Sequence, residues 1–249
     1  MVLANFFEDV GKYVLLMKKV LSFPQKWSTA FRQYINEVQK LGFDSIGIVI
    51  IISFFIGAVI VVQIALNMDN GFLPRYTVGF VSREIIVLEF SSSIMSLILA
   101  GKVGSNIASE IGTMRVTEQI DALEIMGVNS ANYLILPKIV ALMTFIPILV
   151  VLSMVLGLLG GYFVCHFTHI VPVADFEYGI QSFFKPFYVW YSIIKSICFG
   201  AIISSVSAFF GYYVEGGSLE VGKASTNAVV ISSVLILISD LVLTNLMMQ

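Results

Sequence analysis

Apolar residues recur along this chain in two ways: as stripes at helical spacing near the N-terminus, and as long continuous runs further on. Residues 3–21 repeat apolar side chains every three or four positions, with Glu8 one turn before Lys12, where the two can pair. Residues 27–41 show a second stripe opposite polar side chains. Both segments are predicted to be amphipathic helices at a membrane surface, although helices packed on protein would show the same stripes.

Five longer runs are each apolar over a length that can cross a membrane, for which about 20 residues are needed. The predicted spans are residues 45–66, 85–103, 133–165, 187–214 and 226–247. Pro137 is expected to start the third span and Pro147 to bend it. The sequence therefore predicts an all-α polytopic integral membrane protein, with an interfacial N-terminal region (1–44) before a transmembrane domain (45–249).

The segments between the spans are polar and are predicted to be connections. These are residues 68–84, a loop at 166–186 and a glycine-rich loop at 215–225.

Composition supports the membrane assignment. Hydrophobic residues make up 58% of the chain and charged residues 12%, with a mean hydropathy of +0.94, whereas soluble domains carry about 25% charged residues. The net charge of −2 argues against nucleic acid as a partner, because phosphate binding needs clustered Lys and Arg. Cys165 and Cys198 lie inside apolar runs and give no indication of a disulfide.

Basic residues set the predicted orientation, because cytoplasmic flanks retain Lys and Arg. With the N-terminus in the cytoplasm, most of them fall on that side: Lys12, Lys18, Lys19, Lys26, Arg32, Lys40, Lys102, Arg115, Lys138 and Lys223. Arg75, Arg83, Lys185 and Lys195 fall outside or nearer the outer side. Five spans then leave the C-terminus outside.

The block at residues 104–127, between the second and third spans, is too charged to lie in lipid, where each charged side chain costs about 2.5–3.5 kcal/mol. A helix over residues 115–126 would put Val116, Ile120 and Leu123 on one stripe, with Ile125 among the charges opposite. Gly127 tolerates the positive φ that ends such a helix. Such an element can dock in the groove of a soluble partner; a solvated connector would show the same pattern.

A family resemblance rests on this block. The stretch AGKVGSNIASEIGTMRVTEQIDALEIMG at residues 100–127, followed by YLILPK at 133–138, resembles the signature of the MlaE (YrbE) family. The likeness continues through Gly157 to Gly161, KSICFG at 195–200, GGSLEVGKAST at 216–226 and Asp240. It implies the permease subunit of an ABC-type lipid transporter that works with MCE proteins.

The resemblance implies partners and site residues as well. The partners are a second copy of the chain, a cytoplasmic ABC ATPase that holds ATP and Mg, a periplasmic MCE-domain protein and a small STAS-like cytoplasmic subunit, with the permease in the bacterial inner membrane. No cofactor, metal or catalytic residue is expected on this chain. The residues expected to couple it to the ATPase are Glu110, Gly112, Thr113, Met114, Arg115, Glu118, Gln119, Asp121 and Glu124. Phospholipid is the default cargo, while the lipid species and the direction of transport stay open.

Three ionisable residues inside apolar spans are expected to line a lipid pathway or to be buried with partners: Glu89, Lys195 and Asp240. Glu89 matches a glutamate of the family pattern Arg-Glu-Leu-Gly-Pro, but Leu88 replaces the arginine, so the arginine's role is in doubt here. For Glu89 the alternative is a hydrogen bond to Ser92 or Ser93, and for Lys195 it is a pair with Asp240.

A glycine-rich stretch at residues 217–224 is similar to a P-loop but ends in Ala224, where magnesium binding needs a hydroxyl, and no strand precedes it. Nucleotide binding is therefore not expected on this chain.

Two other functions compete with this interpretation. A proton-coupled secondary transporter of a hydrophobic substrate would use the three intramembrane charges. A membrane-embedded enzyme would need the only credible cluster, His166, His169, Asp175 and Glu177, whose two histidines could share a helical face but lack a clear third metal ligand.

Overall fold

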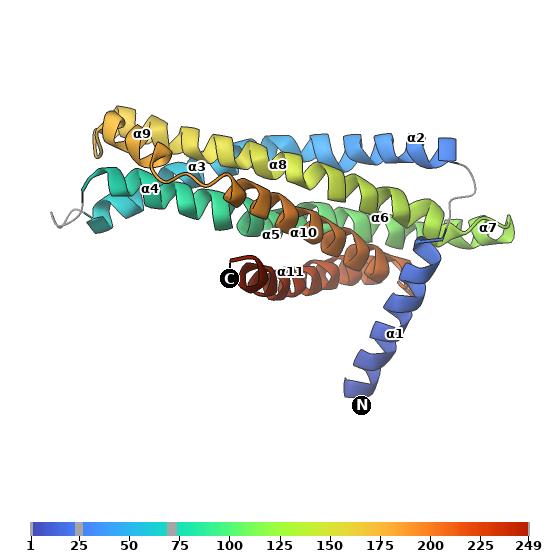
Figure 1. The fold of residues 1–249 in the computed structure, drawn as a ribbon. Helices are drawn as coiled ribbons and strands as arrows, with labels where there is room; N and C mark the ends of the chain where they lie inside the picture. Colours follow the sequence, from blue (N-terminus) through green and yellow to red (C-terminus); the bar gives the residue numbers. More distant parts are fainter. Residues whose placement is uncertain (1, 23–26, 69–73, 249) are drawn as a thin grey trace. The chain divides into compact units, whose positions relative to one another are not determined.

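The computed structural model describes residues 2–22, 27–68 and 74–248, and the regular secondary structure of these ranges is entirely helical (Figure 1). Among the described residues, five helices are long and apolar enough to cross a membrane: Ala30–Met68, Tyr76–Val116, Ser130–Thr168, Phe187–Tyr212 and Ser218–Met248. The predicted all-α polytopic class is confirmed.

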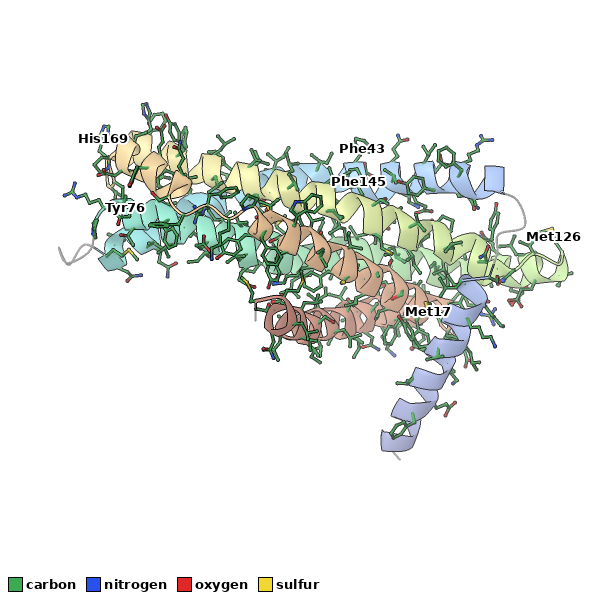
Figure 2. All side chains as sticks on the ribbon, viewed as in Figure 1. Met17, Phe43, Tyr76, Met126, Phe145 and His169 are labelled. Atoms are coloured by element: carbon green, nitrogen blue, oxygen red, sulfur yellow. The ribbon has the colours of Figure 1, made fainter. Side chains whose placement is uncertain are left out.

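The N-terminal part holds two helices, α1 (Val2–Val20) and α2 (Trp27–Glu37). The expected Glu8–Lys12 pair is present on α1 at 2.8 Å. Helix α2 continues through a π-helical segment, η1 (Val38–Phe43), into α3 (Asp44–Met68), so no break marks the expected boundary at residue 44. The Phe43 and Phe145 rings pack with their centroids 5.3 Å apart (Figure 2).

The second long helix begins well before residue 85. It consists of α4 (Tyr76–Ile85), the π-helical segment η2 (Ile86–Ile94), α5 (Met95–Leu99), a second π-helical segment η3 (Ala100–Gly104) and α6 (Ser105–Val116). Such π-helical segments are rare and are often found at functional sites.

The connections at 68–84 and 166–186 both contain helical residues, contrary to the sequence-based prediction of a loop at 166–186. Helix α9 (Val173–Gln181) lies alongside α4 (Figure 1). The backbones meet closely, since a Cβ added at Gly179 would lie 2.1 Å from the Tyr76 carbonyl oxygen. Helix α9 is short and partly polar, and α4 is the partly polar first segment of the second long helix, so neither shows the long apolar run by which the spans are recognised.

Helix α8 (Ser130–Thr168) runs for 39 residues and begins seven residues before Pro137, so the expected start at that proline is wrong. Asn129 caps the helix, because its side-chain oxygen accepts a hydrogen bond from the Asn132 backbone N–H at 3.2 Å. Helices α10 (Phe187–Tyr212) and α11 (Ser218–Met248) complete the chain. Most of the predicted loop at 215–225 is therefore the first part of α11.

The chain forms two compact units, and the long helices contribute to both. The first contains residues up to 44, 97–145 and 198–239, and the second contains 45–96, 146–197 and the residues from 240 on. Leu16, Ile107 and Ile120 are fully buried in the first unit. In the second, Val61, Cys165 and Phe176 belong to one apolar core.

Helix α1 is fastened to the rest of the first unit at two points. Its Tyr13 hydroxyl donates a 2.8 Å hydrogen bond to Ser205 on α10. Beyond its C-terminal end, the Asn132 side-chain amide donates to the carbonyl oxygens of Val20 at 2.7 Å and Ser22 at 2.5 Å. Helix α1 is therefore fixed to the start of α8 by hydrogen bonds rather than by apolar contact alone.

Candidate functional site

The polar block at residues 104–127 forms a tight hairpin of two helices, α6 and α7 (Gln119–Ile125). The single helix expected over residues 115–126 is wrong, because the chain turns at Thr117 and Glu118, where Glu118 has a left-handed φ of 60°. After this turn Ile120 is fully buried, as its place on the predicted apolar stripe requires.

The far end of α7 closes with the predicted glycine. Gly127 has φ 75°, its N–H donates to the Glu124 carbonyl at 2.9 Å, and the next N–H, of Val128, reaches the Leu123 carbonyl at 3.0 Å. This pair of bonds is a Schellman motif, which satisfies the last carbonyls of the helix. Turns of fixed geometry therefore bound α7 at both ends.

The hairpin exposes a mixed acidic and apolar tip, which includes four of the predicted coupling residues: Thr113, Glu118, Gln119 and Glu124. Ile125 is 88% exposed and Met126 is 68% exposed. Figure 2 shows Met126 at the tip of the hairpin. Two large apolar side chains presented to solvent beside carboxylates are typical of a surface that a partner covers.

Other predicted coupling residues have contacts within the first unit. Arg115 donates to Asp121 at 2.5 Å, so these two half-buried residues link α6 to α7. Met114 is half-buried. Gly112 is buried, and a Cβ there would lie 3.2 Å from Val221, which identifies it as a packing position.

Glu124 joins the hairpin to two neighbouring elements. Its carboxylate accepts hydrogen bonds from Ser130 of α8 at 2.9 Å and from Tyr212 of α10 at 3.0 Å. These bonds hold the pKa of the Glu124 carboxyl below its ordinary value of 4.5. The Ser130 and Tyr212 hydroxyls also lie 2.8 Å apart, which completes a three-residue polar cluster.

Glu110 belongs to a cluster of four charges that the sequence did not reveal as a group. It pairs with Lys40 at 2.8 Å and with Lys138 at 2.9 Å, and Lys138 also pairs with Glu37 at 2.8 Å. Lys138, expected only as a basic residue near the cytoplasmic side, is 2% exposed. The four charges connect α2, η1, α6 and α8, so Glu110 is a structural link at the base of the hairpin.

A second charged cluster lies in the second unit around Lys195, whose side chain is fully buried. Its ammonium pairs with Asp240 on α11 and lies 3.5 Å from the Glu89 carboxylate in η2. Ser93 donates to Asp240 at 2.8 Å and to Glu89 at 3.4 Å, so the expected Lys195–Asp240 pair and a serine bond to Glu89 are both present.

The environment distinguishes the two carboxylates. The side chain of Asp240 is 18% exposed, whereas that of Glu89 is 47% exposed. The lysine also lies 4.7 Å from the centre of the Tyr191 ring. Asp240 is therefore the fixed partner of the lysine, and Glu89 is the charge open to another group.

Arg83 is not part of this cluster. It donates to the carbonyl oxygens of Ile180 and Ser182 at 2.7 Å each and pairs with Glu84. It therefore ties α4 to the end of α9, and Lys195 is the cation that faces Glu89.

The two histidines do not share a helical face, contrary to that reading of the sequence. His166 lies in α8, but the helix ends at Thr168 and His169 has a left-handed φ of 53° (Figure 2). Across the described ranges, no group of three or more His, Cys, Asp or Glu side chains is arranged to hold a metal ion.

Comparison with known proteins identifies the family. The family model described as Permease MlaE matches residues 34–246. This chain belongs to the MlaE permease family. A probable ABC transporter permease protein of Rickettsia bellii is 35% identical, over 96% of this chain and 92% of its own length.

Two further relatives each match 88% of this chain. A probable ABC transporter permease protein of Synechocystis is 33% identical, over 88% of this chain and 82% of its own. The chloroplastic protein TRIGALACTOSYLDIACYLGLYCEROL 1 of Arabidopsis thaliana is 31% identical, over 88% of this chain and 62% of its own. The chain is thus a multi-pass transporter permease, a class that moves substrates across membranes.

Proposed function

We propose that this chain is the membrane subunit of an ABC-type lipid transporter and that its α6–α7 hairpin docks on a separate cytoplasmic ATPase. The observation that carries the proposal is the tip of the hairpin, where Ile125 and Met126 are exposed beside Glu118 and Glu124. Two large apolar side chains ringed by charges suit a groove on a soluble partner better than open solvent.

ATP and Mg belong to the partner in this proposal. The relatives named as ABC transporter permeases support an ATPase partner. Residues 218–224 form the first turns of α11, where Ala224 stands in place of the hydroxyl that a magnesium site needs. This chain would therefore receive motion rather than hydrolyse nucleotide.

Lipid is the proposed cargo. One relative carries the name of a galactolipid, trigalactosyldiacylglycerol, and five apolar helices suit acyl chains. The half-exposed Glu89, backed by the buried Lys195–Asp240 pair, is the group we assign to the lipid pathway. An MCE-domain protein would receive or deliver the lipid, and a STAS-like subunit would sit on the ATPase.

The proposed setting is a bacterial inner membrane, with the N-terminus and the hairpin in the cytoplasm and the C-terminus in the periplasm. The basic residues support this orientation, since Lys18 and Lys19 lie in the last turn of α1 and Lys40, Lys102 and Lys138 lie in the same unit as the hairpin.

Charge reversal at the hairpin tests the docking. Glu118→Lys combined with Ile125→Asp should lower the amount of ATPase that co-purifies with the permease by about tenfold or more, because central interface side chains are each worth about 2 kcal/mol. Both side chains are exposed and outside the Arg115–Asp121 pair, so the permease should stay folded. Co-purification at equal expression measures the effect.

Glu177→Lys is the matched control, since Glu177 is an exposed carboxylate on α9 in the second unit. It should leave the complex intact. A fully active complex carrying the double hairpin change would overturn the docking, and lipid movement by this chain alone in proteoliposomes would favour a proton-coupled secondary transporter instead.

A further inference from the structure

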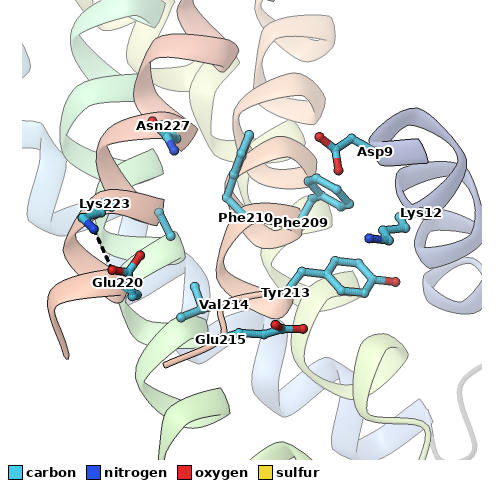
Figure 3. A pocket seen from close by; sticks show the side chains of 11 residues that line it. Asp9, Lys12, Phe209, Phe210, Tyr213, Val214, Glu215, Glu220, Lys223 and Asn227 are labelled. Carbon is cyan, nitrogen blue, oxygen red and sulfur yellow. Dashed lines mark hydrogen bonds and ion pairs between the residues drawn. The ribbon is translucent and has the colours of Figure 1, made fainter. Parts of the chain in front are cut away.

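A cavity of about 410 Å³ opens in the first unit between α1, the end of α10 and the start of α11 (Figure 3). Six of its lining residues carry the argument: Asp9, Lys12, Phe209, Tyr213, Glu215 and Lys223. The volume is within the range of about 300–1,000 Å³ that is usual for small-ligand sites.

The floor of the cavity is aromatic and held in place. The Phe209 ring is 9% exposed and packs edge-on against Tyr13, with their centroids 5.7 Å apart. Tyr13 is itself fixed to Ser205 by a 2.8 Å hydrogen bond. The Tyr213 ring, 42% exposed, lies 5.2 Å from Phe209, so an aromatic surface faces the opening.

The rim carries charges of both signs with a surplus of acid. Lys12 pairs with Glu8 at 2.8 Å and Lys223 pairs with Glu220 at 2.6 Å, each on its own helix. Asp9 and Glu215 make no hydrogen bond or ion pair within 4 Å among the described residues, but both carboxylates lie close enough to Lys12 to attract its charge. Two lysines against three lining carboxylates, with Glu220 counted, leave the site weakly negative.

This combination selects for an ammonium group. Aromatic faces next to carboxylates attract a quaternary or primary ammonium, because the ring face and the carboxylate both present negative charge. A purely anionic ligand would meet the surplus acid. The two exposed lysines at the rim nevertheless provide donors for a phosphate joined to that ammonium.

We propose that this cavity binds the headgroup of a zwitterionic phospholipid, with the ammonium against Tyr213, Phe209 and Glu215 and the phosphate towards Lys223. The neighbouring surface of α1 supplies room for acyl chains, since Val10, Val14 and Leu15 are 44%, 59% and 62% exposed. A bound lipid would hold α1 against α10 and the start of α11. The site does not depend on the ATPase or on which lipid is transported.

Lipid retention by the full-length permease tests the proposal. The purified, delipidated protein is titrated with phosphatidylethanolamine or phosphatidylglycerol of identical acyl chains, and bound lipid is counted by native mass spectrometry. We expect selective retention of phosphatidylethanolamine. Tyr213→Ala and Glu215→Gln should each weaken it about three- to tenfold and leave phosphatidylglycerol unchanged. Glu215→Lys should move the preference towards phosphatidylglycerol.

Two controls keep the result interpretable. Tyr178→Ala removes an exposed tyrosine from α9 in the second unit and should change nothing. Asp9→Asn alters an exposed side chain at the rim, so a loss of retention in this variant, with an unchanged gel-filtration profile, reports on the cavity rather than on folding.

Equal retention of the two lipids, or equal retention by wild type and the cavity variants, would overturn the site. Binding of free phosphoethanolamine as tightly as the lipid would overturn the lipid assignment and identify a soluble ligand. Transport by the complex with its ATPase is measured separately, so a failure there with headgroup binding intact counts against the proposed function alone.

Discussion

Two lysines of the described residues are buried, and each is held by two carboxylates. Lys138 lies between Glu37 and Glu110 in the first unit, and Lys195 lies between Asp240 and Glu89 in the second. Removing one partner from such a group leaves a charge without compensation, whereas removing both costs less. Removing one residue from either cluster should therefore lower the free energy of unfolding more than removing one residue of a surface ion pair.

Lys195→Met tests this at the cluster in the second unit. The change keeps an unbranched side chain, one atom shorter, but leaves Asp240 and Glu89 without their cation, so the free energy of unfolding should fall by about 3 kcal/mol. SDS-induced unfolding of the purified permease measures it. Adding Asp240→Asn should recover part of the loss, and Lys185→Met, at an exposed lysine, should have little effect.

Glu124 gives a prediction of pH dependence. Hydrogen bonds from Ser130 and Tyr212 lower its folded pKa below the ordinary 4.5, so the ionised carboxylate stabilises the fold fully above that pH. The stabilisation is lost as the pH falls through the lower folded pKa. Tyr212→Phe should cost less than about 1 kcal/mol at neutral pH, because Glu124 is exposed to water.

The same Tyr212→Phe difference should shrink when unfolding is measured well below pH 4.5, where the carboxyl is protonated in both proteins. A difference that stays constant with pH would mean that Tyr212 acts through Ser130 and not through the Glu124 charge.

Among the elements, α3 and α8 meet at a contact that only glycine permits. A Cβ added at Gly57 would lie 2.1 Å from the Gly157 carbonyl oxygen and 2.5 Å from its Cα, so the backbones would have to separate. Close approach through small residues is the usual basis of helix packing in membranes, where lipid competes with apolar side chains.

Gly57→Ala should therefore lower the free energy of unfolding by about 1–3 kcal/mol, because the helices cannot separate without losing neighbouring contacts. Gly47→Ala is the matched control on the same helix, since nothing lies within 4 Å of a Cβ there. Unfolding of both variants in the same detergent measures the difference. Equal stability of the two variants would show that α3 and α8 have room for a methyl group at Gly57.

How far the elements could be predicted depended on the physical signal of each. The spans were recognisable because crossing a membrane demands a long apolar run, and the stop at Gly127 because glycine, which lacks a Cβ, adopts positive φ without a clash. The break at Glu118 had no such signal, since glutamate rarely adopts that conformation. The remaining elements, such as the packed helices α4 and α9, depend on tertiary contacts that a local sequence pattern does not show.

The candidate site shows the same division. The polarity of residues 104–127 and the intramembrane charges Glu89, Lys195 and Asp240 could be found from sequence, because each is expensive in lipid. The partners of Glu110 and Glu124 could not, since Lys138 and Tyr212 are distant in sequence and meet them only in the folded chain.

On the scale of the whole molecule, α11 is the least buried of the five candidate spans among the described residues. Within its most apolar stretch 11% of residues are buried, against 61% in α10. Val230, Val234 and Leu237 lie on one face and are 54%, 48% and 53% exposed. We propose that a second copy of the chain covers this face.

Val234→Cys should form a disulfide-linked dimer on mild oxidation, in a background where Cys165 and Cys198 are replaced by alanine. Val155→Cys, at a valine of similar exposure on α8, should remain monomeric on a denaturing gel. Cross-linking of both variants to the same extent would indicate random collision in the membrane rather than a specific interface.

The hairpin of α6 and α7 has little freedom to bend. Its bends at Glu118 and Gly127 have fixed backbone geometry, and Ser130 and Tyr212 both donate hydrogen bonds to Glu124. The side-chain amide of Asn132 holds the end of α1. Under the proposed function, a push from a motor at Ile125 would not be absorbed by bending of the tip. The force would reach the start of α8 and the ends of α10 and α1 at the same time. A single movement of the ATPase would therefore move all three helices.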